Sequence, residues 1–434
     1  MKYIWLLLYG LITVTPAVIL WQQQPDSSLY TLAKVAAVTG FTMLVLQLVL
    51  AARWPWIERW YGQDRIMRFH RRTGTIGTML IVLHPVLLYS YYGSISSAVL
   101  LDFLQPQLDW KLVGQITLLL LLAIVALALW TSRFKLPYHW WKKIHLLVYL
   151  VIIGGFVHSF FLGSDIIMPG TLRTFWWILA GLASAALGYR HVWLPLWLRW
   201  RRHYVIDTIQ TPAKGVHSIT LLAHGNERLQ YTPGQFIFIQ FLSAEVSKEW
   251  HPFTISSSPT EPNLTISIKE SGDWTSTLKN LMPGEKALIE GPFGRFSSTL
   301  LPEQGDLVYI AGGIGITPLR SMVRYLADTN SQRAVTVFYS GRTRHDLAFY
   351  DELKTITSQH PNIRLLATVT DDQNFPAEHS RIDVPLLKKH LSNNLIDKDY
   401  FVCGPPPMMR AIKQQLLTAG VAKHQIHTEE FSLK

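Results

Sequence analysis

Four histidines stand in apolar surroundings at nearly matched spacing. His70 and His84 are 14 residues apart in one segment, and His145 and His158 are 13 apart in another. Fourteen helical residues rise about 21 Å and turn about 40° short of four full turns, so the first two rings share one face. An ionisable side chain at membrane depth is costly, and it therefore marks a functional site by default.

Two helices that each carry two histidines at similar depths can clamp two flat cofactors stacked across a membrane. Bis-imidazole haem is the natural candidate, because histidine is a common axial ligand of haem iron. Thirteen residues leave the second pair of rings about 140° apart on an ideal helix. We therefore expect a local rewinding or bulge, and Gly154–Gly155 lies between these histidines, where kinks occur. A lone membrane histidine often only bonds a neighbouring helix, but four at this spacing favour metal ligation.

Six apolar segments precede residue 200, and each is close to the roughly 20 residues that a helix needs to span a bilayer. They are residues 4–21, 30–52, 73–92, 112–131, 144–162 and 172–190. The first lacks a good small-residue cleavage site, so we expect a retained helix and not a signal peptide. The sequence therefore predicts a multi-domain membrane protein that begins with an all-α six-helix transmembrane bundle.

Charge is distributed unevenly along the chain. Residues 1–202 hold 18 Lys and Arg against 6 Asp and Glu, with 14 of the 16 Trp, whereas residues 203–434 hold 22 against 23. Basic charge with Trp indicates a membrane surface and lipid contact, not nucleic acid. With the N-terminus inside, the inner segments hold 15 basic residues and the outer segments three. This bias predicts that everything after residue 203 lies in the cytoplasm.

Short alternating runs with Gly and Pro turns follow residue 203 and predict a small antiparallel β-barrel. From Asp306 onward, strand and helix patterns alternate, which predicts an α/β domain with a parallel sheet and crossover helices. The expected strands of the barrel include residues 217–223, 236–242, 264–270 and 286–292. The expected domains are 1–202 (transmembrane), 203–300 (β-barrel) and 301–434 (α/β).

Two motifs in the barrel region have the composition of a flavin site. The imidazole, phenyl ring and hydroxyl of "HPFTISSSP" offer a donor for a pyrophosphate, a flat surface for the ring and a hydroxyl for its reactive nitrogen. "ESGDWTSTL" precedes a predicted helix N-terminus, which favours anions. An ordinary strand and turn is the alternative reading of the first motif. The FAD candidates are His251, Pro252, Phe253, Thr254, Gly272, Trp274 and Thr275.

Two further motifs end strands of the α/β region. In "AGGIGITPLRSM" the glycines let backbone approach a pyrophosphate, the threonine can cap the helix and the proline suits its first turn. A Gly-rich turn alone is weak evidence. "FVCGPPPMM" ends a later strand, and its Cys403 excludes an internal disulfide because it is the only cysteine. The nucleotide candidates are Gly312, Gly313, Gly315, Thr317, Pro318, Gly404 and Pro405.

Arg342 and Arg344 follow another strand end, where the ribose of an adenine nucleotide lies in such folds. Arginine binds a 2′-phosphate bidentately, so together with Ser340 the pair favours NADPH over NADH. Solvated loop arginines are the competing interpretation, and a preference for NADH stays open.

Together these motifs resemble the ferric reductase / NADPH oxidase superfamily, most closely its short bacterial members. In that superfamily a di-haem membrane domain is fused to a ferredoxin-reductase-like FAD/NAD(P) module. The resemblance implies that His70 and His145 hold an inner haem b and that His84 and His158 hold an outer one. It also implies that Cys403 lies beside the nicotinamide.

The resemblance implies electron transfer from cytoplasmic NADPH through FAD and both haems to O2 or a ferric chelate outside a bacterial inner membrane. Phe431 would then cover the flavin face. Larger oxidases carry an outer cap and polar residues near the outer haem, whereas Leu88 stands one turn beyond His84, which argues against a specialised oxygen site. The alternatives are electron delivery to a periplasmic protein partner, an NADH-preferring ferric reductase, and a flavin reductase that the helices merely anchor.

Overall fold

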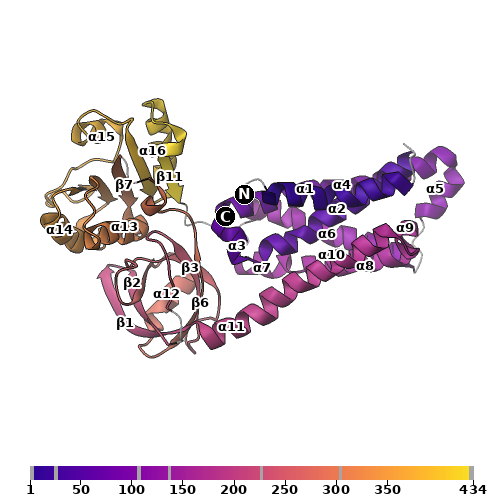
Figure 1. Cartoon of the computed structure of the whole chain (residues 1–434), viewed down its shortest axis with the longest axis horizontal. Coiled ribbons are helices and arrows are strands. Elements are labelled where there is room, and N and C mark those ends of the chain that lie inside the picture. The colour runs from indigo at the N-terminus through magenta and orange to yellow at the C-terminus, as the bar shows by residue number, and fades with distance from the viewer. Residues whose placement is uncertain are drawn as a thin grey trace. The chain divides into compact units, whose positions relative to one another are not determined.

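The chain folds into two compact units, Met1–Leu194 and Pro195–Lys434. The computed structural model describes residues 4–23, 28–104, 109–134, 138–224, 228–302 and 305–429. The first unit is helical and the second contains two β-sheets (Figure 1). The predicted boundaries at residues 202 and 300 stay predictions.

Five helical segments of the first unit are long and apolar enough to cross a membrane, among the residues described. They are Ile4–Gln23, Leu29–Ala51, Arg65–Ile95, Trp110–Trp130 and Trp140–Leu162. The sixth expected span also forms a helix, Thr171–Gly188, but it is not one of these five. Its first turn carries Thr171, Arg173 and Thr174, which dilute its apolar character. The count of six spans is therefore not confirmed.

The helices that precede the first strand follow one another with short connections. In chain order they are α1 (Ile4–Gln23), α2 (Leu29–Ala51), α3 (Pro55–Tyr61), α4 (Gln63–Ile95), α5 (Ser97–Leu104), α6 (Trp110–Phe134), α7 (Tyr138–His145), α8 (Val148–Leu162), α9 (Ser164–Ile167), α10 (Thr171–Gly188), the π-helical turn η1 (Tyr189–Trp193) and α11 (Leu194–Arg201).

Small residues let the helices of the first unit approach one another closely. A Cβ added at Gly40 of α2 would lie 2.9 Å from the carbonyl oxygen of Gly77 on α4. Likewise, a Cβ at Gly154 of α8 would lie 2.3 Å from the Thr117 hydroxyl oxygen of α6. Such contacts replace the hydrophobic driving force that helices lack inside lipid. They fix α4 and α8, the helices that present the histidines.

The fifth expected span is broken directly after its first histidine. Helix α7 ends at His145 and α8 begins at Val148, with a turn at Leu146–Leu147 between them. The expected rewinding thus exists, but its predicted place at Gly154–Gly155 is wrong. Those glycines lie inside the regular helix α8, where they make room for α6 and for Phe41 of α2.

The first sheet of the second unit is antiparallel, as the alternating runs predict. Its strands are β1 (His203–Ala213), β2 (Val216–Ala223), β3 (Phe236–Phe241), β4 (His251–Thr254), β5 (Leu264–Lys269) and β6 (Lys286–Phe293), with the order β4-β3-β6-β1-β2-β5. An isolated bridge between Ile255 and Ile266 joins the two ends of this order. The sheet therefore curls around one apolar core, and the short helices α12 (Asp273–Ser276) and η2 (Thr277–Asn280) follow β5.

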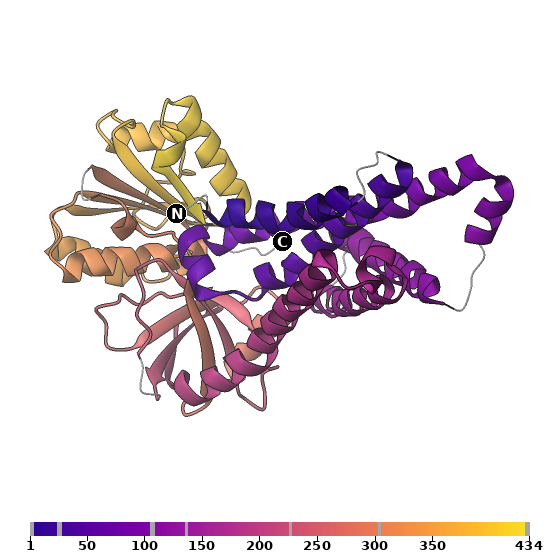
Figure 2. The ribbon, with the colours of Figure 1, turned by 45° about the vertical axis from the view of Figure 1, so that its right-hand side comes forward.

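The second sheet is parallel, with the order β11-β10-β7-β8-β9. Its elements are β7 (Asp306–Gly312), η4 (Gly313–Gly315), α13 (Ile316–Asp328), β8 (Val335–Gly341), η5 (Arg344–Asp346), α14 (Tyr350–Gln359), β9 (Ile363–Val369), α15 (Val384–His390), β10 (Lys398–Cys403), α16 (Pro406–Thr418), η6 (Lys423–Gln425) and β11 (Ile426–Glu429). Helices α13 and α14 cover one face, and α15 and α16 cover the other (Figure 2).

Both faces of this parallel sheet are buried, so β7 is apolar along its length. Leu307 and Tyr309 point into the core beneath α13, whereas Val308 and Ile310 point into the core beneath α16. The chain reverses its direction of winding between β7 and β10, the neighbours at the centre of the sheet. Ligands of open α/β sheets bind at the carboxyl ends of the strands on either side of such a reversal.

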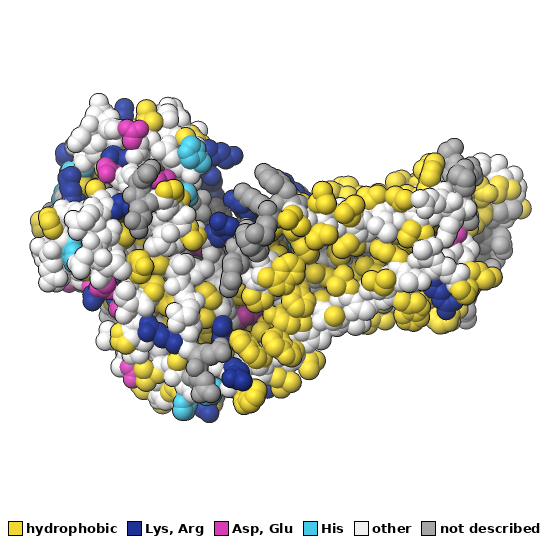
Figure 3. All heavy atoms as spheres, in the orientation of Figure 1, with side chains coloured by type: hydrophobic (Ala, Val, Ile, Leu, Met, Phe, Trp, Pro, Cys, Tyr) yellow, Lys and Arg dark blue, Asp and Glu magenta, His cyan; other side chains and the backbone are white. Residues whose placement is uncertain are grey.

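The two units differ in their surfaces. On the face shown in Figure 3, apolar side chains cover much of the helical unit, and charged side chains are spread over the other. Large apolar residues exposed on the helices include Leu7, Met79, Leu119, Ile153 and Ile178. A surface of this composition is typical of helices that face lipid.

Candidate functional site

The inner pair of histidines faces each other. His70 of α4 and His145, the last residue of α7, have ring centroids 6.3 Å apart, with an angle of 64° between the ring planes. Trp141 stacks on His145 at 5.1 Å. The buried Nδ1 of His145 has no hydrogen-bond partner among the described residues. Since a buried polar nitrogen normally finds a partner, this one is available to a ligand.

The outer pair is oriented by backbone carbonyls. Nδ1 of His84 lies 2.9 Å from the carbonyl oxygen of Ala33, and Nδ1 of His158 lies 2.8 Å from that of Trp110. A carbonyl only accepts, so each Nδ1 carries the proton and each Nε2 keeps its lone pair. Gly114 makes room for this arrangement, because a Cβ there would lie 2.5 Å from Nδ1 of His158.

These positions fit metal-bound imidazoles. A metal–imidazole bond is about 2 Å long. When two imidazoles face each other across one ion, the two bonds and the two ring radii add up to about 6 Å between the ring centroids. The inner pair has this separation. A histidine that binds a metal through one ring nitrogen usually donates the N–H of its other ring nitrogen to a carbonyl or carboxylate. Both His84 and His158 make such a hydrogen bond through Nδ1. The turn at Leu146–Leu147 lies between His145 and His158, so the two residues do not belong to one unbroken helix.

The first flavin motif forms the edge strand β4. His251 and Phe253 point to the same side, and Trp274 of α12 stacks on them with ring centroids at 3.8 Å and 5.9 Å. Pro252 lies between them in the strand. Thr254 is buried, and its hydroxyl has no partner in the described part of the chain. The structure thus brings three aromatic rings together, and the unsatisfied hydroxyl of Thr254 lies on the other side of the strand.

The second flavin motif differs from its expected form. Helix α12 has only four residues, and the hydroxyl of Thr275 accepts hydrogen bonds from the backbone N–H groups of Ser271 and Gly272. The amides that the sequence predicts as an anion site are therefore already satisfied by Thr275. Trp274 is fixed as well, since its indole N–H donates to the carbonyl of Ser247.

The glycine-rich turn and the "CGP" turn pack against each other at the reversal between β7 and β10. A Cβ at Gly315 would lie 2.4 Å from the carbonyl oxygen of Cys403, and one at Gly404 would lie 3.0 Å from the nitrogen of Gly312. A Cβ at Gly312 would meet Pro405 at 2.8 Å. Gly315 and Gly404 are required because two backbones touch there, whereas a side chain at Gly312 would collide with the side chains of Met408 and Pro405.

Gly313 is the member of this turn that faces open space. It has a φ of +53° and nothing within 4 Å of an added Cβ. Pro318 lies in the first turn of α13 as predicted, but Thr317 does not cap the helix. The cap is Gly315, and the Thr317 hydroxyl donates to the carbonyl of Ile314. The backbone at Gly313 is thus the part of the turn available to a phosphate.

Cys403 ends β10 beside this turn and is fully buried. Its Sγ lies 3.7 Å from the carbonyl oxygen of Glu429. Burial, and secondarily the Glu429 carboxylate, raises the pKa of the thiol well above its usual value.

We expect Cys403 to resist alkylation in the folded protein. The thiolate is the reactive form, and both the raised pKa and the absence of solvent contact suppress it. Iodoacetamide labelling at neutral pH, followed by mass spectrometry, should give slow modification natively and rapid modification in guanidinium chloride. Equal rates in the two conditions would contradict a buried thiol.

The structure separates the two arginines of the nucleotide motif. Arg344 is engaged: its guanidinium lies over the ring of Tyr350 and donates to Asp351 at 2.7 Å and to the carbonyl of Leu347. Arg342 is exposed, and its side chain makes no hydrogen bond within the described ranges. Ser340 lies near the carboxyl end of the same strand, β8. Of these two arginines, Arg342 is therefore the one whose guanidinium group makes no hydrogen bond in the described structure.

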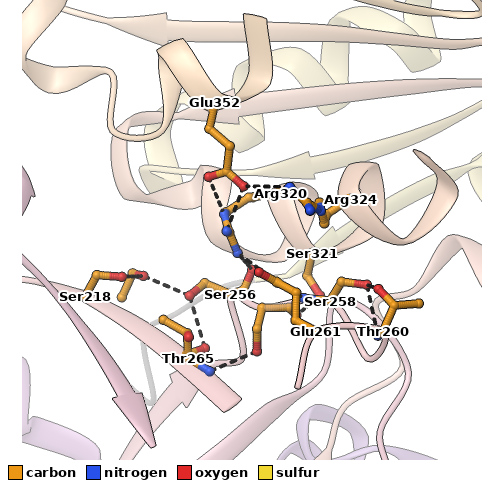
Figure 4. A network of polar contacts seen from close by, with 12 residues as sticks. Ser218, Ser256, Ser258, Thr260, Glu261, Thr265, Arg320, Ser321, Arg324 and Glu352 are labelled. Atoms are coloured by element: carbon orange, nitrogen blue, oxygen red, sulfur yellow. Dashed lines mark hydrogen bonds and ion pairs between the residues drawn. The ribbon is translucent and has the colours of Figure 1, made fainter. Parts of the chain in front are cut away.

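Sequence reasoning missed Arg320, which joins the barrel to the parallel-sheet domain (Figure 4). Arg320 is 9% exposed and binds Glu352 of α14 with two hydrogen bonds of 2.7 and 2.8 Å. It also donates to the carbonyl of Ser256, which follows β4. The hydroxyl of its neighbour Ser321 donates to the carbonyl of Ser257. A charged residue on the apolar side of α13, between Leu319 and Met322, is the signal that could have revealed it.

We expect Arg320→Ala to destabilise this unit by about 2 kcal/mol, because it leaves a carboxylate and a buried carbonyl without their charged partner. Thermal unfolding of the detergent-solubilised protein, followed by fluorescence, would measure the change. Lys389→Ala, which removes the exposed ion pair with Glu378, is the control and should leave the midpoint unchanged. Equal midpoints for both variants would show that the Arg320 network is dispensable.

Phe431, the predicted cover of the flavin, lies outside the described residues. The other predicted site residues lie within them.

Three family profiles match successive and partly overlapping parts of the chain. The "Ferric reductase like transmembrane component" profile matches residues 36–156. The "FAD-binding domain" profile matches residues 214–341, and the "Oxidoreductase NAD-binding domain" profile matches residues 309–414. The first match contains His70, His84 and His145, while His158 lies just beyond its end.

Individual relatives match parts of the chain. The glycine betaine monooxygenase reductase subunit of Chromohalobacter salexigens is 31% identical over 210 residues, which are 46% of this chain and 56% of the relative. The flavohemoprotein of Bordetella pertussis is 28% identical over 250 residues, 54% of this chain and 61% of the relative. The chain thus spans somewhat more than half the length of these curated relatives.

Among solved structures, the flavohemoglobin of Malassezia yamatoensis superposes with a TM-score of 0.50 and 20% identity, over 96% of this chain and 99% of that one. This likeness concerns the fold alone. The reductase domains and the relatives named reductase or flavohemoprotein make this chain an oxidoreductase. It has the fused architecture of the ferric reductase and NADPH oxidase superfamily, with a ferric reductase-like transmembrane component followed by FAD-binding and NAD-binding domains.

Proposed function

We propose that this chain is a transmembrane electron transferase that connects NADPH, through FAD and two b-type haems, to an acceptor on the opposite side of the membrane. The observation that carries the proposal is the two-level arrangement of histidines on α4, α7 and α8. When bound, FAD would accept one hydride, which carries two electrons, and release those electrons singly to haem, which can pass them across a bilayer.

Four histidines would hold the two irons. His70 and His145 would bind the inner haem, for which their ring separation of 6.3 Å is suited. His84 and His158 would bind the outer haem through Nε2, because each Nδ1 is bonded to a carbonyl. Those carbonyls keep each ring in one tautomer and one orientation, and they make Nε2 a better donor to a metal.

The second unit would position the flavin and the nicotinamide. The rings of His251, Phe253 and Trp274 offer a flat surface, and the unsatisfied hydroxyl of Thr254 would donate to the flavin ring. At the reversal between β7 and β10, the open backbone of Gly313 would receive the nucleotide pyrophosphate.

Further residues would complete these two sites. Gly312, Gly315, Gly404 and Pro405 would shape the nucleotide turn, and Cys403 would lie beside the nicotinamide. Arg342 would bind the 2′-phosphate, and Phe431 would cover the flavin until the nicotinamide docks.

The proposed location is a bacterial inner membrane, with the flavin and nicotinamide domains in the cytoplasm. The distribution of 15 basic residues in the inner segments against three in the outer ones supports this orientation. Protease digestion of inverted and right-side-out vesicles would test it. Cleavage after residue 203 in inverted vesicles only is the expected result, and cleavage in right-side-out vesicles only would reverse the orientation.

The cofactor content of the purified chain tests the central claim. A pyridine haemochrome assay should give two b-type haems per chain, and anaerobic NADPH should reduce both. A flavin-containing, NADPH-reducible chain without haem would instead be a flavin reductase anchored by its helices.

Two acceptors agree with the short outer connections, O2 and a ferric chelate. Superoxide dismutase-sensitive reduction of cytochrome c would identify O2 as the acceptor, whereas ferrous-chelate formation that persists without oxygen would identify ferric iron. A turnover that appears only with a purified periplasmic protein would favour an electron-delivery role in place of both.

A further inference from the structure

A pocket of about 360 Å³ opens at the basic end of the helical unit, and none of the four histidines is among its lining residues. Its walls come from the first turns of α1, the last turn of α2, α3 and the first turns of α4. Three of its lining residues are Arg65, Arg68 and Arg72 of α4. Because they are three and seven residues apart, they line one face of that helix.

These three arginines are exposed. None of their guanidinium groups makes a hydrogen bond, an ion pair or a contact over an aromatic ring with any side chain that the structure describes. Other arginines have such partners, as Arg202 does on Trp197 and Arg344 does on Asp351. Three like charges on one wall repel each other, so an anion between them would relieve the repulsion as well as satisfy the donors.

The remaining walls of the pocket are apolar. Trp5 and Leu6 come from α1, Leu50 closes the pocket from α2, and Phe69 lies on α4. Aromatic contacts frame it, because Trp5 packs against Trp56 at 5.7 Å and Tyr9 of α1 against Phe69 at 4.8 Å. Aromatic rings of this kind gather where lipid headgroups meet the hydrocarbon. The pocket thus joins an anion site to an apolar slot at headgroup depth.

We propose that this pocket binds one anionic phospholipid, with the phosphate between Arg65, Arg68 and Arg72 and an acyl chain along the wall of Trp5 and Leu6. The charge selects an anionic headgroup, and the apolar wall selects a molecule that carries a hydrocarbon chain. Basic pockets between transmembrane helices bind anionic headgroups in this way. The lipid would fill the gap between α1 and α4, where α1 has few buried residues of its own. The proposal rests on the membrane location of this unit and not on the electron path.

Native mass spectrometry of the detergent-solubilised protein tests the proposal. The probes are dioleoylphosphatidylglycerol, dioleoylphosphatidylcholine and inorganic phosphate. We expect one tightly held phosphatidylglycerol per chain, weaker retention of phosphatidylcholine and no displacement by inorganic phosphate. Arg68→Gln/Arg72→Gln should weaken phosphatidylglycerol binding roughly tenfold or more, since each surface charge changes the affinity by roughly fivefold.

Two matched variants complete the experiment. Arg71→Gln removes one charge from the same turn of α4, but Arg71 does not line the pocket, so this variant should weaken binding far less than the double variant does. Leu6→Trp narrows the apolar slot, keeps all charges and should also weaken binding. Equal affinity in the double variant and in Arg71→Gln, or equal retention of phosphatidylcholine, would overturn the proposal. Displacement by inorganic phosphate would assign the arginines to a soluble anion.

Discussion

Replacing His84 by alanine should remove one of the two proposed haems while NADPH still reduces the flavin. His84 would supply one of the two nitrogens that hold the outer haem, and its ring is bonded to the carbonyl of Ala33. A single remaining imidazole holds haem far less firmly, whereas the inner pair of His70 and His145 is untouched. The haem content measured by pyridine haemochrome should therefore fall from two per chain to one, and haem reduction should stop at the inner level.

Two further variants show whether this loss is specific. His191→Ala removes a histidine whose Nε2 hydrogen-bonds the hydroxyl of Tyr149, and it should keep both haems. Gly114→Ala places a Cβ 2.5 Å from Nδ1 of His158, so it should displace that ring and weaken the outer site without removing any ligand. Two haems per chain in His84→Ala would rule out the assignment of His84.

Replacing Arg342 by alanine should raise the KM for NADPH roughly ten- to a hundredfold, because a charge-assisted contact with a phosphate contributes about 1.5–3 kcal/mol. The KM for NADH should change little, since NADH has no 2′-phosphate. Steady-state reduction of an artificial acceptor with each nucleotide would measure both constants. The side chain of Arg342 is exposed and makes no hydrogen bond in the described structure, so its removal should leave the fold intact.

Arg344→Ala is the matched comparison, because it removes the same charge two residues away. Arg344 is bonded to Asp351 and lies over Tyr350, so its loss should lower stability or affect both nucleotides alike. Equal changes of the KM for NADPH and for NADH in Arg342→Ala would show that Arg342 does not bind the 2′-phosphate. A selective loss in Arg344→Ala would instead transfer that role to Arg344.

Periodicity predicted the elements well, because burial imposes it directly. Alternating residues gave the strands β2, β3, β5 and β6, and apolar runs gave the long helices. The 14-residue spacing of His70 and His84 could be trusted because α4 continues unbroken through both. Helix α4 begins at Gln63, before the predicted apolar segment 73–92, because a helix can extend beyond the hydrocarbon where its polar residues are solvated.

Features that depend on contacts between different helices and strands could not be predicted from the sequence. Leu146–Leu147 contains no Gly or Pro and continues into the apolar run of α8, so nothing in these two residues marks the break after His145. The two glycines in α8 indicate a kink when read alone, but their reason is the close approach of α6 and of Phe41. Thr275 and Arg320 likewise acquire their roles only when the chain folds back on itself.

The burial of Cys403 has a practical consequence for measuring motion. Since the only sulfhydryl of the chain is shielded, one cysteine introduced on an exposed surface would be the single reactive site for a nitroxide or a fluorophore. Pairs of such sites, one on each unit, would report distances in a lipid bilayer before and after nucleotide is added. The native sequence can therefore serve as its own cysteine-free background for spectroscopy.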